Sequence, residues 1–96
     1  MTENKNIFKL SKSVNFDGKE YTELTLAFGE LTGSDILAAE AQYLGTGGQP
    51  TVLETSKRFQ AITAAKVAKV PVELIYQLSA KDFSKITMQV QNFLLA

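Results

Sequence analysis

The stretch Asn15–Leu26, NFDGKEYTELTL, places a turn dipeptide between two segments in which apolar and polar residues alternate. Asp17-Gly18 favours a tight turn, because glycine adopts a positive φ without steric cost. Alternation with a period of two is typical of a strand with one buried face. The stretch therefore predicts a β-hairpin over residues 7–28.

The register of this hairpin depends on the length of its turn. A two-residue turn would pair Phe16 with Lys19 and place the even-numbered apolar residues of the two strands on opposite faces. A three-residue turn, with Gly18 in the left-handed position of a bulge, pairs even with even residues. One face then collects Phe8, Leu10, Val14, Leu24, Leu26 and Phe28. Because an amphipathic hairpin must bury a single face, we predict the bulged three-residue turn.

The rest of the chain is expected to be helical. The predicted helices span residues 33–44, 51–69, 71–77 and 80–95. Thr32 and Asp35 have the spacing of a capping box before the first helix, and Ser79 and Asp82 repeat it before the last. The segment GTGGQP, residues 45–50, predicts a flexible Gly-rich linker.

No segment after the hairpin has the periodicity of a strand. A lone two-stranded hairpin is unstable in water, so its apolar face must pack on the helices or on a partner. We therefore predict an α+β, mostly helical fold, with an N-terminal β-hairpin packed on a bundle of three to four helices. A single domain is expected over 7–96, after a disordered N-terminus at 1–6.

The composition argues against several classes of function. The 96 residues contain no cysteine and no histidine, which removes thiol chemistry, the commonest general base and the commonest transition-metal ligand. No carboxylate stands in a motif with a nucleophile, and GTGGQP lacks the ending of a phosphate loop. We expect a protein that is not an enzyme and has no cofactor and no metal. Without an apolar run of membrane-spanning length or a signal peptide, we expect it in the cytoplasm, away from membranes.

Charge is balanced over the whole chain but segregated along it. Lys plus Arg and Asp plus Glu number ten each, so no global basic field attracts nucleic acid. From Glu20 to Glu54 there are six acids and no base, and from Lys57 to Lys69 four bases and no acid. We expect the two regions to face each other or to solvate their own surfaces, with a binding patch as the alternative.

Residues 65–79, AKVAKVPVELIYQLS, resemble a helix-turn-helix. The segment in the place of the recognition helix carries Glu73 and no Lys or Arg, whereas contacts to phosphates and bases favour cations there. A small helix-turn-helix-like regulator that binds nucleic acid is therefore the alternative function.

One residue of the first helix and two of the second suggest an internal ion pair. Glu40 lies within an apolar arc, and Lys66 lies at the edge of the second helix's apolar stripe. We hypothesise that these two side chains pair across the bundle, with each other or with Arg58. The alternative is that their stems lie along apolar surface while their charged heads reach water.

Three segments in order carry a family resemblance. They are LSKSVNFDGKEYTELTL, LTGSDILAAE and VPVELIYQLSAKDFSKITMQVQNFLL. Together they resemble the small tail assembly chaperones of long-tailed bacteriophages and prophages, over most of residues 7–95. Ser13 stands where proline is common in that family, and GTGGQPTVLE replaces a more helical connection.

The resemblance implies a protein that binds the long, coiled-coil-prone tape measure protein, keeps it soluble and promotes polymerisation of the tail tube protein around it. It implies a homo-oligomer in the cytoplasm of a bacterial host, without nucleic acid. The chain end NFLLA is apolar on several sides, which is typical of docking in the core or of contact with a partner. The residues expected to bind the partner are Met88, Phe93, Leu94 and Leu95.

Overall fold

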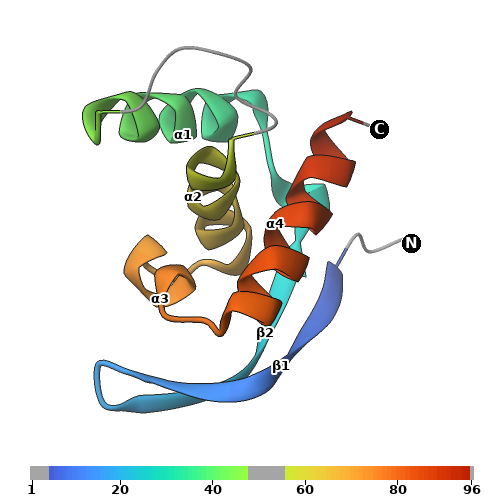
Figure 1. Ribbon diagram of the computed structural model, residues 1–96. Coiled ribbons are helices and arrows are strands. Elements are labelled where there is room, and N and C mark those ends of the chain that lie inside the picture. Colours follow the sequence, from blue (N-terminus) through green and yellow to red (C-terminus); the bar gives the residue numbers. More distant parts are fainter. Residues whose placement is uncertain (1–4, 48–55, 96) are drawn as a thin grey trace.

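The computed structural model describes residues 5–47 and 56–95. Within these two stretches an antiparallel hairpin comes first and four α-helices follow. Figure 1 shows how these elements are arranged. The elements are β1 (Lys5–Phe16), β2 (Lys19–Ala27), the 3-10 helix η1 (Phe28–Glu30), α1 (Gly33–Gly45), α2 (Lys57–Ala68), α3 (Val72–Tyr76) and α4 (Ala80–Leu95). The apolar face of the hairpin packs on the helices, which confirms the predicted fold class.

Most predicted boundaries lie close to the observed ones. β1 begins at Lys5, so two residues of the segment expected to be disordered are paired in the sheet, opposite Ala27 and Leu26. α1 ends one residue later than predicted, and α4 spans the predicted residues. Residues 48–55 hold half of the predicted linker and the predicted start of the second helix, and they lie outside the described residues.

The turn of the hairpin differs from the prediction. Phe16 pairs with Lys19, so the turn has two residues. Asp17 and Gly18 both have positive φ angles, of 53° and 80°. This is the pattern of a type I′ turn, whose twist matches that of the strands on either side. The predicted bulged three-residue turn is therefore wrong.

The common apolar face is present all the same, because the register changes farther along the strands. Between the pairs Lys9–Glu23 and Val14–Tyr21, four residues of β1 lie opposite one residue of β2. This bulge turns the even–odd pairing near the turn into even–even pairing beyond it. The predicted face is buried or packed against the core: Phe8, Leu10, Val14, Leu24, Leu26 and Phe28.

Replacing Gly18 with alanine is expected to lower the free energy of unfolding by about 1 kcal/mol. The reason is the backbone alone, because an added Cβ would meet no atom within 4 Å. Gly33→Ala is the matched control, since that position is equally open and lies in the first turn of α1. Urea denaturation measures both. Equal losses at the two positions would contradict the left-handed geometry of Gly18.

The helix α2 lies at the centre of the molecule. It contacts α1, α3, α4 and β2. Every residue from Phe59 to Ala65 is buried, and the alanines among them let neighbouring elements approach closely. The apolar stripe expected along one side of this helix therefore covers only part of its buried surface. A helix surrounded by other elements must be apolar or hydrogen-bonded on nearly every side.

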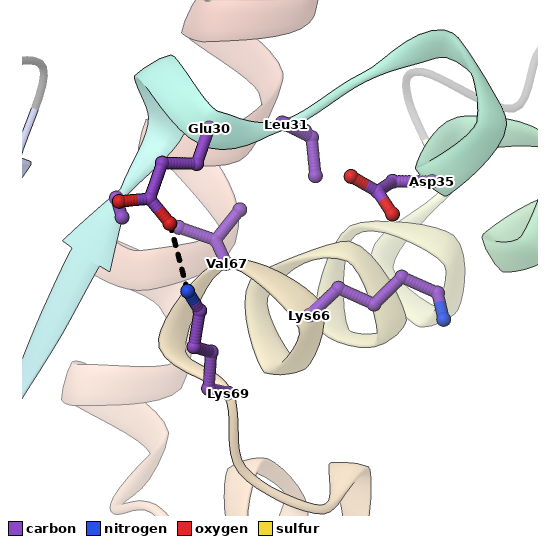
Figure 2. A pocket seen from close by; sticks show the side chains of 7 residues that line it. Glu30, Leu31, Asp35, Lys66, Val67 and Lys69 are labelled. Atoms are coloured by element: carbon purple, nitrogen blue, oxygen red, sulfur yellow. Dashed lines mark hydrogen bonds and ion pairs between the residues drawn. The ribbon is translucent and has the colours of Figure 1, made fainter.

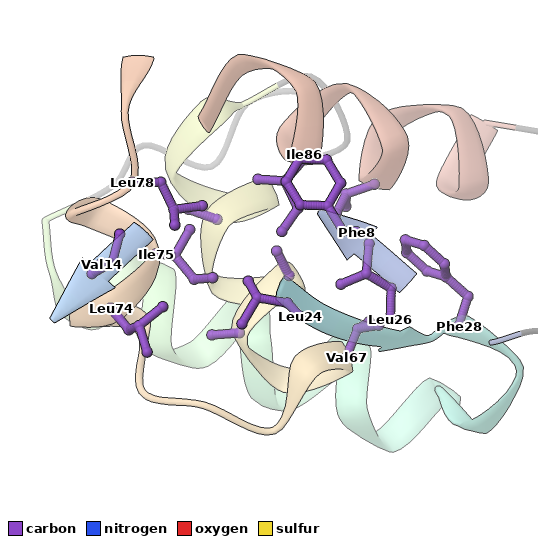
Figure 3. Packing of buried hydrophobic residues seen from close by; sticks show 14 residues of the cluster. Phe8, Val14, Leu24, Leu26, Phe28, Val67, Leu74, Ile75, Leu78 and Ile86 are labelled. Carbon is purple, nitrogen blue, oxygen red and sulfur yellow. The ribbon is translucent and has the colours of Figure 1, made fainter. Parts of the chain in front are cut away.

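Two clusters of buried side chains hold the elements together. The larger one, seen in Figure 3, joins the hairpin to α2, α3 and α4. The smaller one joins α1 to α2 through Ala39, Tyr43, Phe59 and Ile62. Within it the rings of Tyr43 and Phe59 meet edge to face, with centroids 6.2 Å apart. The position of α1 therefore depends mainly on the smaller cluster.

Candidate interaction surface

The helix α4 is divided lengthwise into a buried and an exposed face. Ile86 and Val90 are fully buried, and the buried hydroxyl of Thr87 donates to the carbonyl oxygen of Phe83 at 2.8 Å. On the opposite face, Met88 and Leu95 are 45% and 56% exposed. They are seven positions apart in the sequence, so they lie about two turns apart on one side of the helix. We name these two residues the α4 strip.

The other two residues predicted to bind the partner pack against the rest of the protein. Phe93 stacks on Phe28 with ring centroids 4.8 Å apart and an angle of 27° between the planes. Leu94 is partly buried and packs against both clusters. The structure thus divides the four predicted residues into an outward-facing pair and a pair that fastens the end of α4 to the body of the protein.

A buried carboxylate sets the position of α4 against the hairpin. As predicted, the hydroxyl oxygen of Ser79 accepts the backbone N–H of Asp82, at 3.2 Å. The Asp82 side chain, however, accepts the backbone N–H of Ser11 at 2.9 and 3.1 Å and that of Lys12 at 3.4 Å. These N–H groups lie in the bulge of β1, where the strand-to-strand pairing is interrupted. Asp82 therefore joins the helix to the bulge instead of completing a capping box like that of Thr32 and Asp35.

The charge of this carboxylate is maintained by its hydrogen bonds. Burial raises the pKa of Asp82, but the hydrogen bonds from Ser11, Lys12 and Ser79 outweigh burial and hold the pKa below its ordinary value. A carboxylate that accepts several N–H groups is stabilised in its charged form. Asp82 is therefore ionised at neutral pH although its side chain is only 1% exposed.

Polar side chains also join α4 to the central helix. The ammonium group of Lys57 donates to the hydroxyl oxygen of Thr87 at 2.8 Å. The side-chain amide of Gln60 donates to the amide oxygen of Gln91 at 2.9 Å. Because hydrogen bonds are directional, these two bonds fix the position of α4 along the length of α2. Apolar packing alone specifies this position less well.

A second exposed apolar face lies on α1, and the sequence pattern alone does not separate it from the core-facing side. Ala39 and Tyr43 are buried, whereas Leu37 and Leu44 are 65% and 41% exposed, with Ala41 exposed between them. We name Leu37, Ala41 and Leu44 the α1 strip. The signal in the sequence is an alanine four residues after one leucine and three before another, a spacing that places all three on one side of a helix.

The three residues of the hypothesised internal ion pair differ in how exposed they are and in where they lie. Glu40 is half-buried beside the α1 strip, Lys66 is half-buried on α2 and Arg58 is exposed in the first turn of α2. Among the residues that the structure describes, no ion pair joins Glu40 to either of the two bases.

The acidic and basic segments do meet at one place. Figure 2 shows the ammonium group of Lys69 donating to a carboxylate oxygen of Glu30, at 2.7 Å. The hydrogen bond and the charge of Glu30 raise the pKa of Lys69 above its ordinary value. Both side chains are largely exposed, so the pair adds little stability. It lies at a pocket of about 260 Å³ that Asp35 and Lys66 also line.

The chemistry of this pocket is that of a solvated surface. Its two acids and two bases offset one another, and the Glu30–Lys69 pair already occupies two of the four. Across residues 5–47 and 56–95, no group of three His, Cys, Asp or Glu side chains is placed to hold a metal ion. No helix in the described part of the chain is long and apolar enough to cross a membrane.

In the region that resembles a helix-turn-helix, α3 stands in the place of the recognition helix and carries no Lys or Arg. α3 has five residues, of which Leu74 and Ile75 are buried. Glu73 and Tyr76 are its exposed side chains. A recognition helix places several polar or cationic side chains in the major groove, and α3 is too short and too acidic for that role.

Comparison with known proteins agrees with the resemblance seen in the sequence. The family described as phage tail assembly chaperone proteins, E, or 41 or 14, matches residues 7–95. The match spans nearly the whole chain, and the chain belongs to this family. No curated protein and no solved structure matches it significantly.

Proposed function

We propose that this tail assembly chaperone binds the tape measure protein, keeps it soluble and promotes assembly of the tail tube around it in the cytoplasm of the bacterial host. The observation that carries the proposal is the α4 strip. Met88 and Leu95 are large apolar side chains held in solvent on one side of a helix. Exposed apolar side chains arranged along a helix are a common recognition mode for a partner helix.

The packing of α4 supports a binding role for this face. Asp82 fixes the start of the helix against β1, and Phe93 and Leu94 fix its end against η1 and the core clusters. The strip is thus presented by a helix that is already ordered, which lowers the entropic cost of binding. A tape measure protein with coiled-coil character has an apolar seam along its helices. The apolar side chains of the α4 strip can pack on such a seam.

Co-expression with the tape measure protein tests the proposal. The parent protein is expected to bring that partner into the soluble fraction and to co-purify with it. The double variant Met88→Gln/Leu95→Gln is expected to reduce the soluble, co-purified partner at least tenfold. Both side chains are exposed, so the substitutions leave the core intact, which circular dichroism checks. Truncation after Gln89 is a poorer test because it also removes the fully buried Val90.

The matched control is Tyr76→Gln, which removes an exposed apolar side chain of similar accessibility from α3. It is expected to leave the yield of soluble partner unchanged. If the strip variant solubilises the partner as well as the parent does, the α4 strip is not the binding site. A partner that is equally soluble without the chaperone would remove the proposed function itself.

A further inference from the structure

The outer edge of β2 is an unpaired strand edge. Among the described residues the sheet has two strands, so β2 pairs with β1 on one side and with no strand on the other. The residues that flank a two-residue turn form a hydrogen-bonded pair, so the backbone groups of Lys19 and Tyr21 point towards β1. The backbone groups of Glu20 and Thr22 therefore point away from it. Within the described parts of the chain, no other element forms a backbone hydrogen bond with this edge.

The outer edge of β1 is protected in a way that the edge of β2 is not. A bulge interrupts β1, and Asp82 accepts the backbone N–H groups of Ser11 and Lys12 there. Bulges, prolines and lysines along an edge are common devices that prevent a further strand from pairing. Residues 20–25 of β2 contain no extra bulged residue, no proline and no lysine. β2 is therefore the edge at which a third strand can pair.

A groove of about 370 Å³ runs along this edge. Residues 19–25 of β2 all line it on one side. Because successive side chains of a strand point to opposite faces, a hollow that touches all of these residues follows the edge of the strand and not one face. The other wall is the end of α2 and the residues after it, where Ala68 and Val70 are apolar and half-buried. The groove thus offers free backbone groups on one side and apolar surface on the other.

The charge around the groove favours a basic occupant. Glu20 and Glu23 line the groove, are exposed and form no ion pair within the described residues. Of the two lysines that line it, Lys69 is paired with Glu30 at 2.7 Å, and the ammonium group of Lys19 lies over a neighbouring tyrosine ring. The C-terminal end of α2, which carries a partial negative charge, forms part of the wall. Three acids and a helix end against two bases leave an excess of negative charge, which attracts Lys and Arg side chains.

We propose that the outer edge of β2 binds an extended, basic segment of a partner protein, which adds to the hairpin as a third strand. The backbone groups of Glu20 and Thr22 hydrogen-bond to the segment, and the groove takes its alternate side chains. Since a sheet of two strands is only marginally stable, the third strand also stabilises the hairpin. A second copy of this chain is a poor occupant, because pairing of two β2 edges would set Glu20 and Glu23 against like charges. The groove shares no residue with the α4 strip, so the proposal does not depend on the function proposed above.

Titration of the full chain into a synthetic peptide tests the proposal. The probe is Lys-Val-Lys-Thr-Lys-Val-Lys, labelled with fluorescein and amidated at its C-terminus, and fluorescence anisotropy measures its Kd. We expect the probe to bind and two matched peptides to bind at least tenfold more weakly. One matched peptide has Glu in place of every Lys. The other keeps the lysines but carries methyl groups on its central backbone nitrogens, which prevents strand addition without changing the charge.

Two variants of the protein locate the binding site. Thr22→Pro removes an N–H group that points away from β1, so the hairpin keeps its own hydrogen bonds while those to a third strand are interrupted. Glu20→Lys reverses a charge of the groove at an exposed side chain. Each variant is expected to bind the probe at least tenfold more weakly than the parent. The matched control is Glu73→Lys, because Glu73 is also exposed but lies outside the groove, and it is expected to bind like the parent.

Amide hydrogen exchange identifies the mode of binding. The bound probe is expected to slow exchange at Glu20 and Thr22 more than at Tyr21, whose N–H group already points towards β1. Three results would overturn the proposal: a basic probe that does not bind, a methylated probe that binds equally well, and a Glu20→Lys variant that binds as tightly as the parent. Circular dichroism checks the fold of each variant. If Thr22→Pro does not fold, Glu20→Lys and the methylated probe still decide the question.

Discussion

Replacing Phe59 with alanine is expected to lower the free energy of unfolding by about 4 kcal/mol, the largest effect of any substitution proposed for this protein. Phe59 is 1% exposed and forms the centre of the smaller cluster, against Tyr43, Ala39 and Ile62. Removing its ring leaves a cavity between α1 and α2 and abolishes the edge-to-face contact with Tyr43. Urea denaturation followed by far-ultraviolet circular dichroism measures the loss.

The same substitution is expected to loosen α1 before the rest of the molecule. Since the smaller cluster joins α1 to α2, amide hydrogen exchange in α1 should rise more than exchange in α4. Phe93→Ala is the matched control: it removes the same ring from a site that is 39% exposed, and should cost about 1 kcal/mol. Uniform faster exchange across all helices would show that α1 does not depend on this cluster.

Replacing Asp82 with alanine is expected to lower the free energy of unfolding by about 2–3 kcal/mol. The substitution removes the acceptor for the backbone N–H groups of Ser11 and Lys12 and separates the start of α4 from the bulge of β1. Asp35→Ala is the matched control. Asp35 is also the third residue of a helix, but it lies in an exposed capping box within its own helix end. Its loss should cost about 1 kcal/mol.

The contribution of Asp82 also has a defined pH dependence. Its folded-state pKa lies below the unfolded value of about 3.9, so the stabilisation is fully present above that pH and is lost as the pH falls through the folded-state value. The difference in unfolding free energy between the parent and Asp82→Asn should therefore be constant from pH 7 to about pH 5 and shrink below about pH 4. A difference that stays constant down to pH 2 would show that the Asp82 charge contributes nothing.

Local sequence determined the elements of this protein because short-range chemistry specifies them. Asp17-Gly18 marks the turn, Thr32 with Asp35 starts α1, and Ser79 starts α4. In each case the physical cause lies within a few residues of its effect. The order of these same motifs along the chain also indicates the family to which the protein belongs.

The register of the hairpin could not be read from the turn, because two different backbones give the same buried face. A bulged turn and a bulge in the middle of β1 both bring Phe8 and Leu24 to one side. The second arrangement needs an acceptor for the N–H groups of the bulge. That acceptor, Asp82, lies about 70 residues farther along the chain, where no local pattern connects it to Ser11.

For the candidate binding residues, too, local sequence predicted one part and contacts between distant segments decided the other. The composition of the last helix indicated an apolar chain end, and Met88 and Leu95 are indeed exposed there. That Phe93 and Leu94 serve as anchors follows from the position of Phe28 and of the clusters, which are contacts between distant segments. On α1 the apolar arc around Glu40 did not show which of its side chains face the core, and Leu37 and Leu44 are exposed.

Sequence by itself determined the hairpin, the helices, the cap residues Thr32 and Ser79 and the family, because each depends on periodicity, on turn chemistry or on motif order within a short stretch of chain. Only the tertiary structure decided which apolar side chains remain exposed outside the core. A helix with apolar residues on more than one side buries whichever side its neighbours cover, and α2 covers only one side of α1. The free strips on α1 and α4 exist because the core is complete without them.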